Sequence, residues 1–238
     1  MVANSMVLFR SVSLVATLIA AFTVLPSGSA QAADCSASAA PGVDWTGCDK
    51  EIIIMSGSDL SGATLVETDF TSTDLRDSNL LAANFEKATL VRASLARSKA
   101  DGAKFDRIEA YRTNFSELMA SGATFASAEI QRSNFTGAKL DNVDFTKAEL
   151  GRADFADADV SGAKFGLANL ARADFSKATF SAPIDFAGSF LFLTRIEGLD
   201  LSAATGLAQW QVDMACGDGN TKLPGDLKAG PNWPCNFD

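Results

Sequence analysis

Large apolar residues recur at every fifth position over most of the chain. From Leu60 to Phe180, 22 of the 25 residues in this column are large and apolar, and the other three are alanines. Two positions before each of them the residue is usually Ala, Ser or Thr, and the residue in between is usually polar. A period of five fits neither an α-helix, with about 3.6 residues per turn, nor a flat strand, with a period of about two. The pattern therefore indicates a chain that turns once in every five residues and buries two of the five.

The repeating segments resemble those of a known family. Segments such as Ala153-Asp154-Phe155 and Ala173-Asp174-Phe175 are similar to the A(D/N)LXX signature of the bacterial pentapeptide-repeat family, and the resemblance covers about half of the chain. It implies an all-β solenoid, a right-handed quadrilateral β-helix in which each repeat forms one side and four repeats complete a coil. Coils of this kind stack at strand spacing, about 4.8 Å, and share one continuous core.

The size of the inward residues varies around the predicted coil. Phenylalanine occupies two opposite sides, one with Phe105, Phe125, Phe145 and Phe165 and the other with Phe115, Phe135, Phe155 and Phe175. Ala110 follows Ile108 two positions earlier, so the bulk has moved upstream and the packed volume is roughly kept. Ala100 follows Ser98 and has no such compensation. We therefore expect a local void or dent at Ala100.

The N-terminus is typical of a secretory signal peptide. Arg10 is its only charged residue, an apolar run extends from Ser11 to Leu25, and small residues follow, so cleavage is expected near Ala32 or Ala33. The alternative is an uncleaved membrane anchor, but the apolar run is short for a transmembrane helix. These features predict a periplasmic or secreted protein with no stable membrane insertion after cleavage.

The remaining chain divides into a repeat body with a cap at each end. We expect a signal peptide at 1–33, an N-terminal cap and first coil at 34–59, the β-helix at 60–201 and a C-terminal cap at 202–238. The five-residue frame slips by one residue after Phe180, beside Pro183. The C-terminal cap should combine a short helix near Leu207 to Cys216 with a plug in which Trp233 covers the last coil.

Four cysteines flank the repeat body. Cys35 and Cys48 precede it, and Cys216 and Cys235 follow it. An even number of cysteines in an exported protein favours disulfides, and of the three possible pairings the two local ones are favoured. Metal binding is the alternative, but the CxxC spacing of many metal sites is absent.

Composition excludes several kinds of chemistry. The chain has no histidine, which rules out histidine metal sites and Ser-His-Asp triads. Its many carboxylates occupy a repeating position, which favours solvation over a single catalytic site. Asp218 and Asn220 lie in a Gly-rich turn but lack EF-hand spacing, so an ordinary turn is favoured over a calcium site. The sequence thus predicts no catalytic residue, no cofactor and no metal site.

One outward feature is regular enough to be a candidate binding surface. Arginine recurs every 20 residues, which would place one guanidinium on each coil: Arg92, Arg112, Arg132, Arg152 and Arg172. In the simpler interpretation, nearby acidic and amide residues compensate this column: Glu109, Glu129, Glu149, Asn114, Asn134, Asp154 and Asp174. In the alternative, the column docks an anionic partner, either a protein or an envelope polyanion.

Two functions from different classes remain. A third, less favoured alternative is an enzyme whose catalytic site is not recognisable from the sequence. The favoured one is a non-enzymatic structural or protein-interaction module of the bacterial cell envelope or extracellular space. The alternative is DNA mimicry, because some members of the resembling family are acidic rods that protect topoisomerases from quinolones. The formal net charge of −9 disfavours nucleic acid as a partner. Export disfavours mimicry, because topoisomerases are cytoplasmic, and the oligomeric state stays open.

Overall fold

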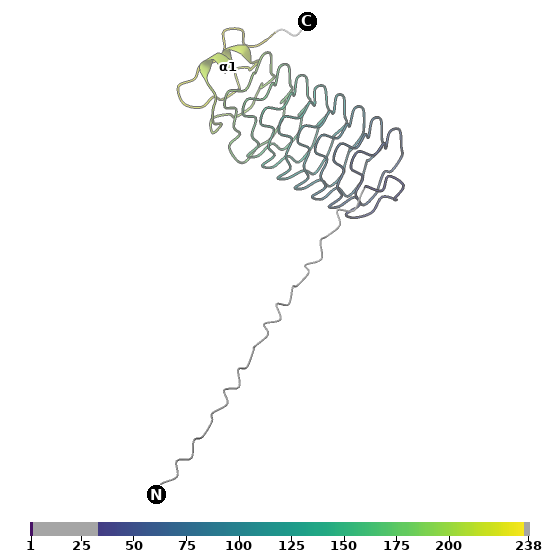
Figure 1. Ribbon diagram of the computed structural model, residues 1–238. Helices are drawn as coiled ribbons and strands as arrows, with labels where there is room; N and C mark the ends of the chain where they lie inside the picture. Colours follow the sequence, from purple (N-terminus) through teal and green to yellow (C-terminus); the bar gives the residue numbers. More distant parts are fainter. Residues whose placement is uncertain (2–32, 236–238) are drawn as a thin grey trace. The chain divides into compact units, whose positions relative to one another are not determined.

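Parallel backbone bridges join residues that lie 20 positions apart in a long ladder. It runs from the bridge between Asp44 and Thr64 to the bridge between Asp159 and Thr179, with a bridge at every fifth residue. The computed structural model describes Met1 and residues 33–235, and Figure 1 shows the coils stacked side by side along the body. Residues 2–32 are not described, so the expected signal peptide lies outside the described residues except for Met1 and Ala33. The predicted period of five and coil of 20 residues are confirmed.

Each side of a coil holds one bridging residue and one tight turn. In the turn from Leu90 to Ala93, the N–H of Ala93 donates to the carbonyl of Leu90 at 2.9 Å, and Arg92 has a φ of 58°. A positive φ at the second central residue is the mark of a type II turn. Because two of every five residues form such a turn, the described coils consist of isolated bridges rather than longer strands.

The core contains two stacks of phenylalanine rings. Rings one coil apart lie nearly parallel, such as Phe115 and Phe135 at 4.8 Å between centroids, and rings on opposite sides meet edge to face, such as Phe125 and Phe135 at 5.9 Å. Both arrangements are favourable for aromatic pairs. Ile108 is fully buried beside the fully buried Ala110, as the volume exchange predicts.

The small inward column is not wholly apolar. Where it carries Ser or Thr, the hydroxyl donates to a carbonyl of the preceding coil, as Thr113 does to Leu90 O at 2.6 Å and Ser98 does to Leu75 O at 2.8 Å. These bonds satisfy buried hydroxyl groups that would otherwise destabilise the core. Ala100 is fully buried. A hollow of about 320 Å³ lies on the outer face of the side of the coil that contains Ala100, and Arg97 and Lys99 line part of it. The void or dent expected at Ala100 itself stays a prediction.

The frame slip is visible in the ladder. The separation of bridged residues rises from 20 to 21 at the pair Lys164 and Asp185, and Phe186 then takes the buried position. Pro183 lies in the segment that contains the additional residue. A hollow of about 250 Å³ is lined in part by residues that shortly precede Pro183 in the sequence, among them Thr179 and Phe180. The insertion after Phe180 is therefore confirmed.

The C-terminal residues extend the ladder and then close it. Cys216 and Lys222 still form parallel bridges with Arg195 and Asp200, so bridging continues past Leu201 into the expected cap. A short helix, α1 (Gln209–Met214), lies at this end of the stack (Figure 1).

Two side chains fill the C-terminal end. Gln211 of α1 is fully buried, and its amide nitrogen donates to Phe186 O at 2.8 Å and Ser189 O at 2.9 Å. Trp233 packs against the core, and its indole N–H donates to Ala215 O at 2.6 Å.

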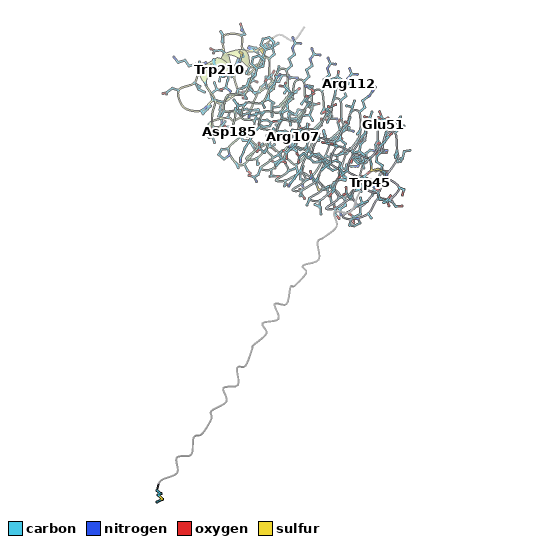
Figure 2. All side chains as sticks on the ribbon, in the orientation of Figure 1. Trp45, Glu51, Arg107, Arg112, Asp185 and Trp210 are labelled. Atoms are coloured by element: carbon cyan, nitrogen blue, oxygen red, sulfur yellow. A yellow bond between two sulfur atoms is a disulfide. The ribbon has the colours of Figure 1, made fainter. Side chains whose placement is uncertain are left out.

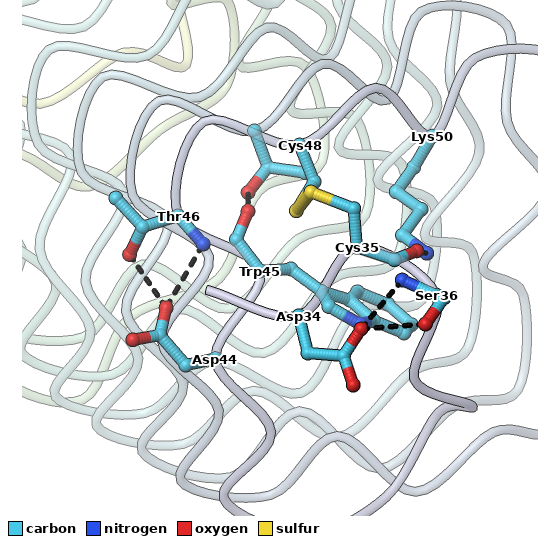
Figure 3. The surroundings of a disulfide bond; sticks show 9 residues. Asp34, Cys35, Ser36, Asp44, Trp45, Thr46, Cys48 and Lys50 are labelled. Atoms are coloured by element: carbon cyan, nitrogen blue, oxygen red, sulfur yellow. Dashed lines mark hydrogen bonds between the residues drawn. A yellow bond between two sulfur atoms is a disulfide. The ribbon is translucent and has the colours of Figure 1, made fainter. Parts of the chain in front are cut away.

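The N-terminal end is covered by a smaller cap (Figure 3). Cys35 forms a disulfide with Cys48, and the buried Trp45 packs beneath this segment. The Lys50 ammonium donates to Cys35 O at 2.7 Å and lies 4.1 Å from the centre of the Trp45 ring. At the other end Cys216 pairs with Cys235. Both disulfides are the local pairings that the sequence favours.

Candidate functional site

The five arginines occupy one corner of the coil in five consecutive coils. Each is the second central residue of a type II turn, with φ between 58° and 60°, and each backbone N–H donates to the next coil, from Arg92 to Tyr111 O at 3.1 Å up to Arg172 to Phe192 O at 2.8 Å. All five residues are exposed. Figure 2 shows Arg112 projecting from the margin of the stack. We call this set the arginine column.

The residues expected to compensate the arginine column form no direct ion pair with it. Within residues 33–235, none of the five guanidiniums makes an ion pair with a carboxylate. Asp174 pairs instead with Arg195 at 2.9 Å, and Glu149 accepts a hydrogen bond from the Asn169 amide at 2.8 Å. The Arg112 guanidinium lies 5.1 Å from the centre of its neighbouring Tyr111 ring.

The polar residues beside the column have a structural use. Asn114, Asn134, Asp154 and Asp174 each accept the N–H of the residue two positions later, at 2.8 to 3.0 Å. This bond holds the start of the next turn, which explains why Asp or Asn recurs at this position of the repeat. Glu109, Glu129 and Glu149 lie on the other flank and are exposed, forming an acidic ladder beside the basic one.

The other three corners of the coil carry no uniform charge. One is made of small or neutral residues: Gly62, Ala82, Gly102, Gly122, Asn142 and Gly162. The other two mix charged and neutral residues. One carries three cations, one anion and one serine: Glu67, Lys87, Arg107, Ser127 and Lys147. The other carries three anions, one cation and one glycine: Asp77, Arg97, Glu117, Gly137 and Asp157. Three of the four cations on these corners form ion pairs, Lys87 with Glu67, Arg97 with Asp77 and Arg107 with Glu86, whereas Lys147 forms none within the described residues. The arginine column therefore differs from corners built on the same backbone turn.

No cluster of three or more His, Cys, Asp or Glu residues able to hold a metal occurs in residues 33–235. The Asp218 carboxylate is occupied within the chain, since it accepts hydrogen bonds from the backbone N–H groups of Gly198, Asn220 and Thr221 at 2.9 to 3.0 Å. The bonds from Asn220 and the other donors lower the pKa of Asp218. In the same residues no helix is both long and apolar enough to cross a bilayer.

Exposed apolar groups form a second feature, which sequence reasoning missed. Ile52 and Ile54 are 77% and 82% exposed in the first coil, and Phe190 and Phe192 are exposed near the last coils with their rings nearly parallel at 6.2 Å. Their signal was present in the sequence: outward positions are polar in most coils, and these break the pattern. We return to the isoleucines below.

Comparison with known proteins identifies a family. Pentapeptide repeats match the chain in eight copies over residues 53–182, more than half of its length. No curated protein sequence matches the chain.

Two solved structures are similar to the chain. Full-length QnrB1, a plasmid-mediated fluoroquinolone resistance protein, is 21% identical, with a TM-score of 0.57 over 73% of this chain and 86% of QnrB1. HetL is a pentapeptide repeat protein involved in heterocyst differentiation regulation from the cyanobacterium Nostoc sp. strain PCC 7120. It is 20% identical, with a TM-score of 0.49 over 82% of this chain and 91% of HetL. At this identity the QnrB1 likeness shows the fold alone.

Proposed function

This chain belongs to the pentapeptide-repeat family, and we propose that it is a non-enzymatic module of the cell envelope or extracellular space that binds a polyanion along its arginine column. The fold of the family's solved structures implies that its coil is right-handed. Members of the family are in general structural or interaction proteins rather than enzymes. The observation that carries the proposal is the set of five exposed guanidiniums that form no ion pair within residues 33–235.

The two disulfides support a location outside the cytosol. They join Cys35 to Cys48 and Cys216 to Cys235, and no cysteine of the chain is left free. Bonds of this kind form and persist in oxidising compartments. The signal peptide expected at 1–33 agrees with this location.

The spacing of the column favours a repetitive ligand over a folded one. Neighbouring guanidiniums are one coil apart, about 4.8 Å, and the five span about 19 Å. The residues next to them vary without pattern: Val91, Tyr111, Gln131, Gly151 and Ala171. Only the positive charge repeats along this surface, so the surface suits a ligand in which negative charge repeats at a regular spacing. We therefore favour an anionic polymer of the envelope over an acidic protein segment.

Repulsion among the five arginines of the unbound protein also favours a polyanionic ligand. Five like charges at this spacing repel one another, and a bound polyanion would remove that repulsion. Arginine suits this role because its fork of donors stays charged and binds carboxylate or phosphate with two hydrogen bonds. DNA mimicry is not favoured, since a mimic presents negative charge where this corner is positive.

A triple variant tests the proposal. Arg112→Gln, Arg132→Gln and Arg152→Gln remove three central charges, and Lys87→Gln, Arg107→Gln and Lys147→Gln remove three charges from another corner at turn residues with φ of 58° to 61°. Both variants change the net charge equally. Binding is measured at two ionic strengths to polygalacturonate and long-chain polyphosphate, which compare carboxylate with phosphate ligands, and to polyglutamate, which represents an acidic protein segment.

We expect the arginine-column variant to bind the polymer roughly ten- to hundredfold more weakly, from three contacts of about 0.5–1 kcal/mol each. The control variant should bind as the native protein does. Binding of the native protein should weaken with added salt, because exposed charges are screened. An equal loss in both variants, or no loss in either, contradicts the proposal, and tighter binding to polyglutamate than to the other polymers identifies a protein partner instead.

A further inference from the structure

The N-terminal coil has one side whose edge is unprotected. Four outward residues bridge this coil to the next one: Asp44, Asp49, Ile54 and Asp59. Charged side chains on an exposed edge prevent other strands from pairing with it. Three of the four sides thus carry the usual protection, and the fourth presents Ile54, which is 82% exposed.

The backbone of Ile54 is free to pair. In later coils the residue at this position donates its N–H to the preceding coil, as Asp74 does to Ile53 O at 2.9 Å. Its carbonyl accepts from the preceding coil, as Ser94 O does from the Leu75 N–H at 2.8 Å. Within the described residues no coil precedes Ile54, and neither its N–H nor its carbonyl has a hydrogen-bond partner there.

The cap leaves this side open. Its backbone bond to the first coil reaches another side, from Asp34 N to Asp44 O at 3.2 Å, and Gly42 N bonds to Ser61 O of the next coil at 2.8 Å. Its disulfide and its Lys50 contact lie near Trp45 (Figure 3). In the described residues no backbone bond runs from the cap to 51–55.

The isoleucines beside this edge are unusual for their positions. Ile52 is 77% exposed and has a φ of 56°, a conformation that β-branched residues rarely adopt. The same corner carries Ser72 and then the arginine column in the next coils. Exposed branched side chains next to free backbone groups form a surface of the kind that accepts an added strand.

The charge around the edge selects the partner. Glu51 precedes the isoleucines, and its hydrogen bond to Asp69, together with the negative charges of Asp69 and Asp49, raises its pKa. Figure 2 shows Glu51 at the same end of the stack as Trp45. Two copies meeting edge to edge would bring these carboxylates together, which disfavours a second copy. A partner with cationic side chains would relieve the crowding instead.

We propose that the edge formed by residues 52–54 binds an extended peptide segment of a partner protein, with apolar residues at alternate positions and Lys or Arg between them. Main-chain hydrogen bonds to Ile54 hold the strand, Ile52 and Ile54 contact its apolar residues, and Glu51 and Asp69 face its cations. This site is separate from the arginine column, and its partner has the opposite charge.

The test uses the processed protein, a ten-residue peptide of alternating Val and Lys, and a matched peptide of alternating Val and Glu. The site variant is Ile52→Gly with Ile54→Asp. The control is Leu167→Gly with Phe190→Asp, which changes an exposed turn residue and an exposed bridging residue near the other end. Binding is measured by calorimetry, and exchange of the Ile54 amide by NMR.

We expect the Val–Lys peptide to slow exchange of the Ile54 amide at least tenfold and to bind the site variant at least tenfold more weakly than the native protein or the control. The Ile54→Asp change adds a negative charge, so attraction of a cationic peptide by net charge alone would make its binding tighter. A weaker interaction therefore reports strand pairing.

Four outcomes overturn the proposal. They are equal or tighter binding by the site variant, equal binding of the Val–Glu peptide, an Ile54 amide already protected in the free processed protein, and a dimer that the site variant abolishes. The last two would show that the edge is occupied by the chain's own N-terminal segment or by a second copy.

Discussion

The two ends of the coil stack are closed to different degrees. At the C-terminal end the side chains of Gln211 and Trp233 enter the last coil, and the ladder runs on to Lys222. At the N-terminal end the cap covers Trp45 but leaves Ile54 with free backbone groups. A solenoid has to cover both ends, because each presents unpaired backbone and an exposed slice of core. The difference suggests that the C-terminal end serves stability and the N-terminal end also serves binding.

Removing the disulfides should cause the largest loss of stability at each end. Replacing Cys216 and Cys235 by Ala opens a loop with a sequence separation of 19, and the loss should be about 3 kcal/mol of unfolding free energy. Replacing Cys35 and Cys48 opens a separation of 13 and should cost slightly less. Urea unfolding of both variants measures the difference. A larger loss from the N-terminal pair would reverse the comparison.

Buried polar contacts give the next largest effect. Gln211→Leu leaves the carbonyls of Phe186 and Ser189 and the N–H of Ala208 without their partner, and we expect a loss of about 2–3 kcal/mol. Lys50→Met keeps the packing of the stem on Trp45 and removes one hydrogen bond and one cation–π contact, for a loss of about 1–2 kcal/mol. Thermal unfolding of the two variants ranks them, and equal losses would mean that the caps are equivalent.

The same turn substitution should stabilise the protein at the N-terminal end but not near the C-terminal end. Ile52→Gly relieves an unfavourable backbone conformation that costs about 1–2 kcal/mol, against about 0.5–1 kcal/mol of lost chain entropy. We therefore expect a gain of about 0.5–1 kcal/mol. Leu193→Gly, in the same corner near the other end with φ of 53°, also removes a half-buried side chain, so no gain is expected there. Equal shifts in melting temperature would contradict this distinction.

Two carboxylates should respond to acid in opposite directions, Asp200 near the C-terminal end and Glu51 at the N-terminal end. Other carboxylates at the N-terminal end respond as Asp200 does, because hydrogen bonds lower their pKa values as well: Asp34, Asp44 and Asp59. Hydrogen bonds from Lys222 and Ser202 lower the pKa of Asp200 to about 2 from its ordinary 3.8, so its contribution is present above that ordinary value and is lost as pH falls from about 4 through 2. The pKa of Glu51 is raised, mainly by its hydrogen bond to Asp69, so its contribution is present below its ordinary 4.5 and is lost as pH rises through the folded value.

Amide exchange at the two ends, followed from pH 2 to 6, measures this effect, which is the smallest because both groups are exposed. The Lys222 amide reports the C-terminal end and the Asp69 amide the N-terminal end. Asp200→Asn should remove the acid-dependent change at Lys222, and Glu51→Gln should remove the opposite change at Asp69. A pH profile at Asp69 that Glu51→Gln leaves unchanged would contradict the assignment.

The repeat body was predictable because each position of the repeat recurs many times, so its preferred residue type can be seen along a whole column. The buried columns, the two phenylalanine stacks and the slip after Phe180 all follow from a period that recurs many times. The disulfides were predictable because the four cysteines fall in two pairs that flank the body. The arginine column was predictable as a column, since a period of 20 residues puts one residue on each coil.

What the arginines contact was not predictable. Their distance in sequence from Glu109 or Asp174 allows an ion pair, but the turn directs each guanidinium outward, and Asp174 holds a backbone N–H and Arg195 instead. Side chains at a coil corner have several acceptors within reach, and only the folded backbone selects among them. Within the described residues the column therefore forms no direct ion pair, and compensation by the neighbouring acidic ladder of Glu109, Glu129 and Glu149 stays a prediction.

The sequence alone determined the coil, because a period of five that persists over more than 100 residues leaves one way to bury its apolar columns. The tertiary structure decided everything that occurs only once. It placed Gln211 in the last coil, sandwiched Trp233 close to Gly217 and Gly230, and left Ile54 at an uncovered edge. Single positions have no repeat to reveal their environment, because that environment is made by residues distant in the chain.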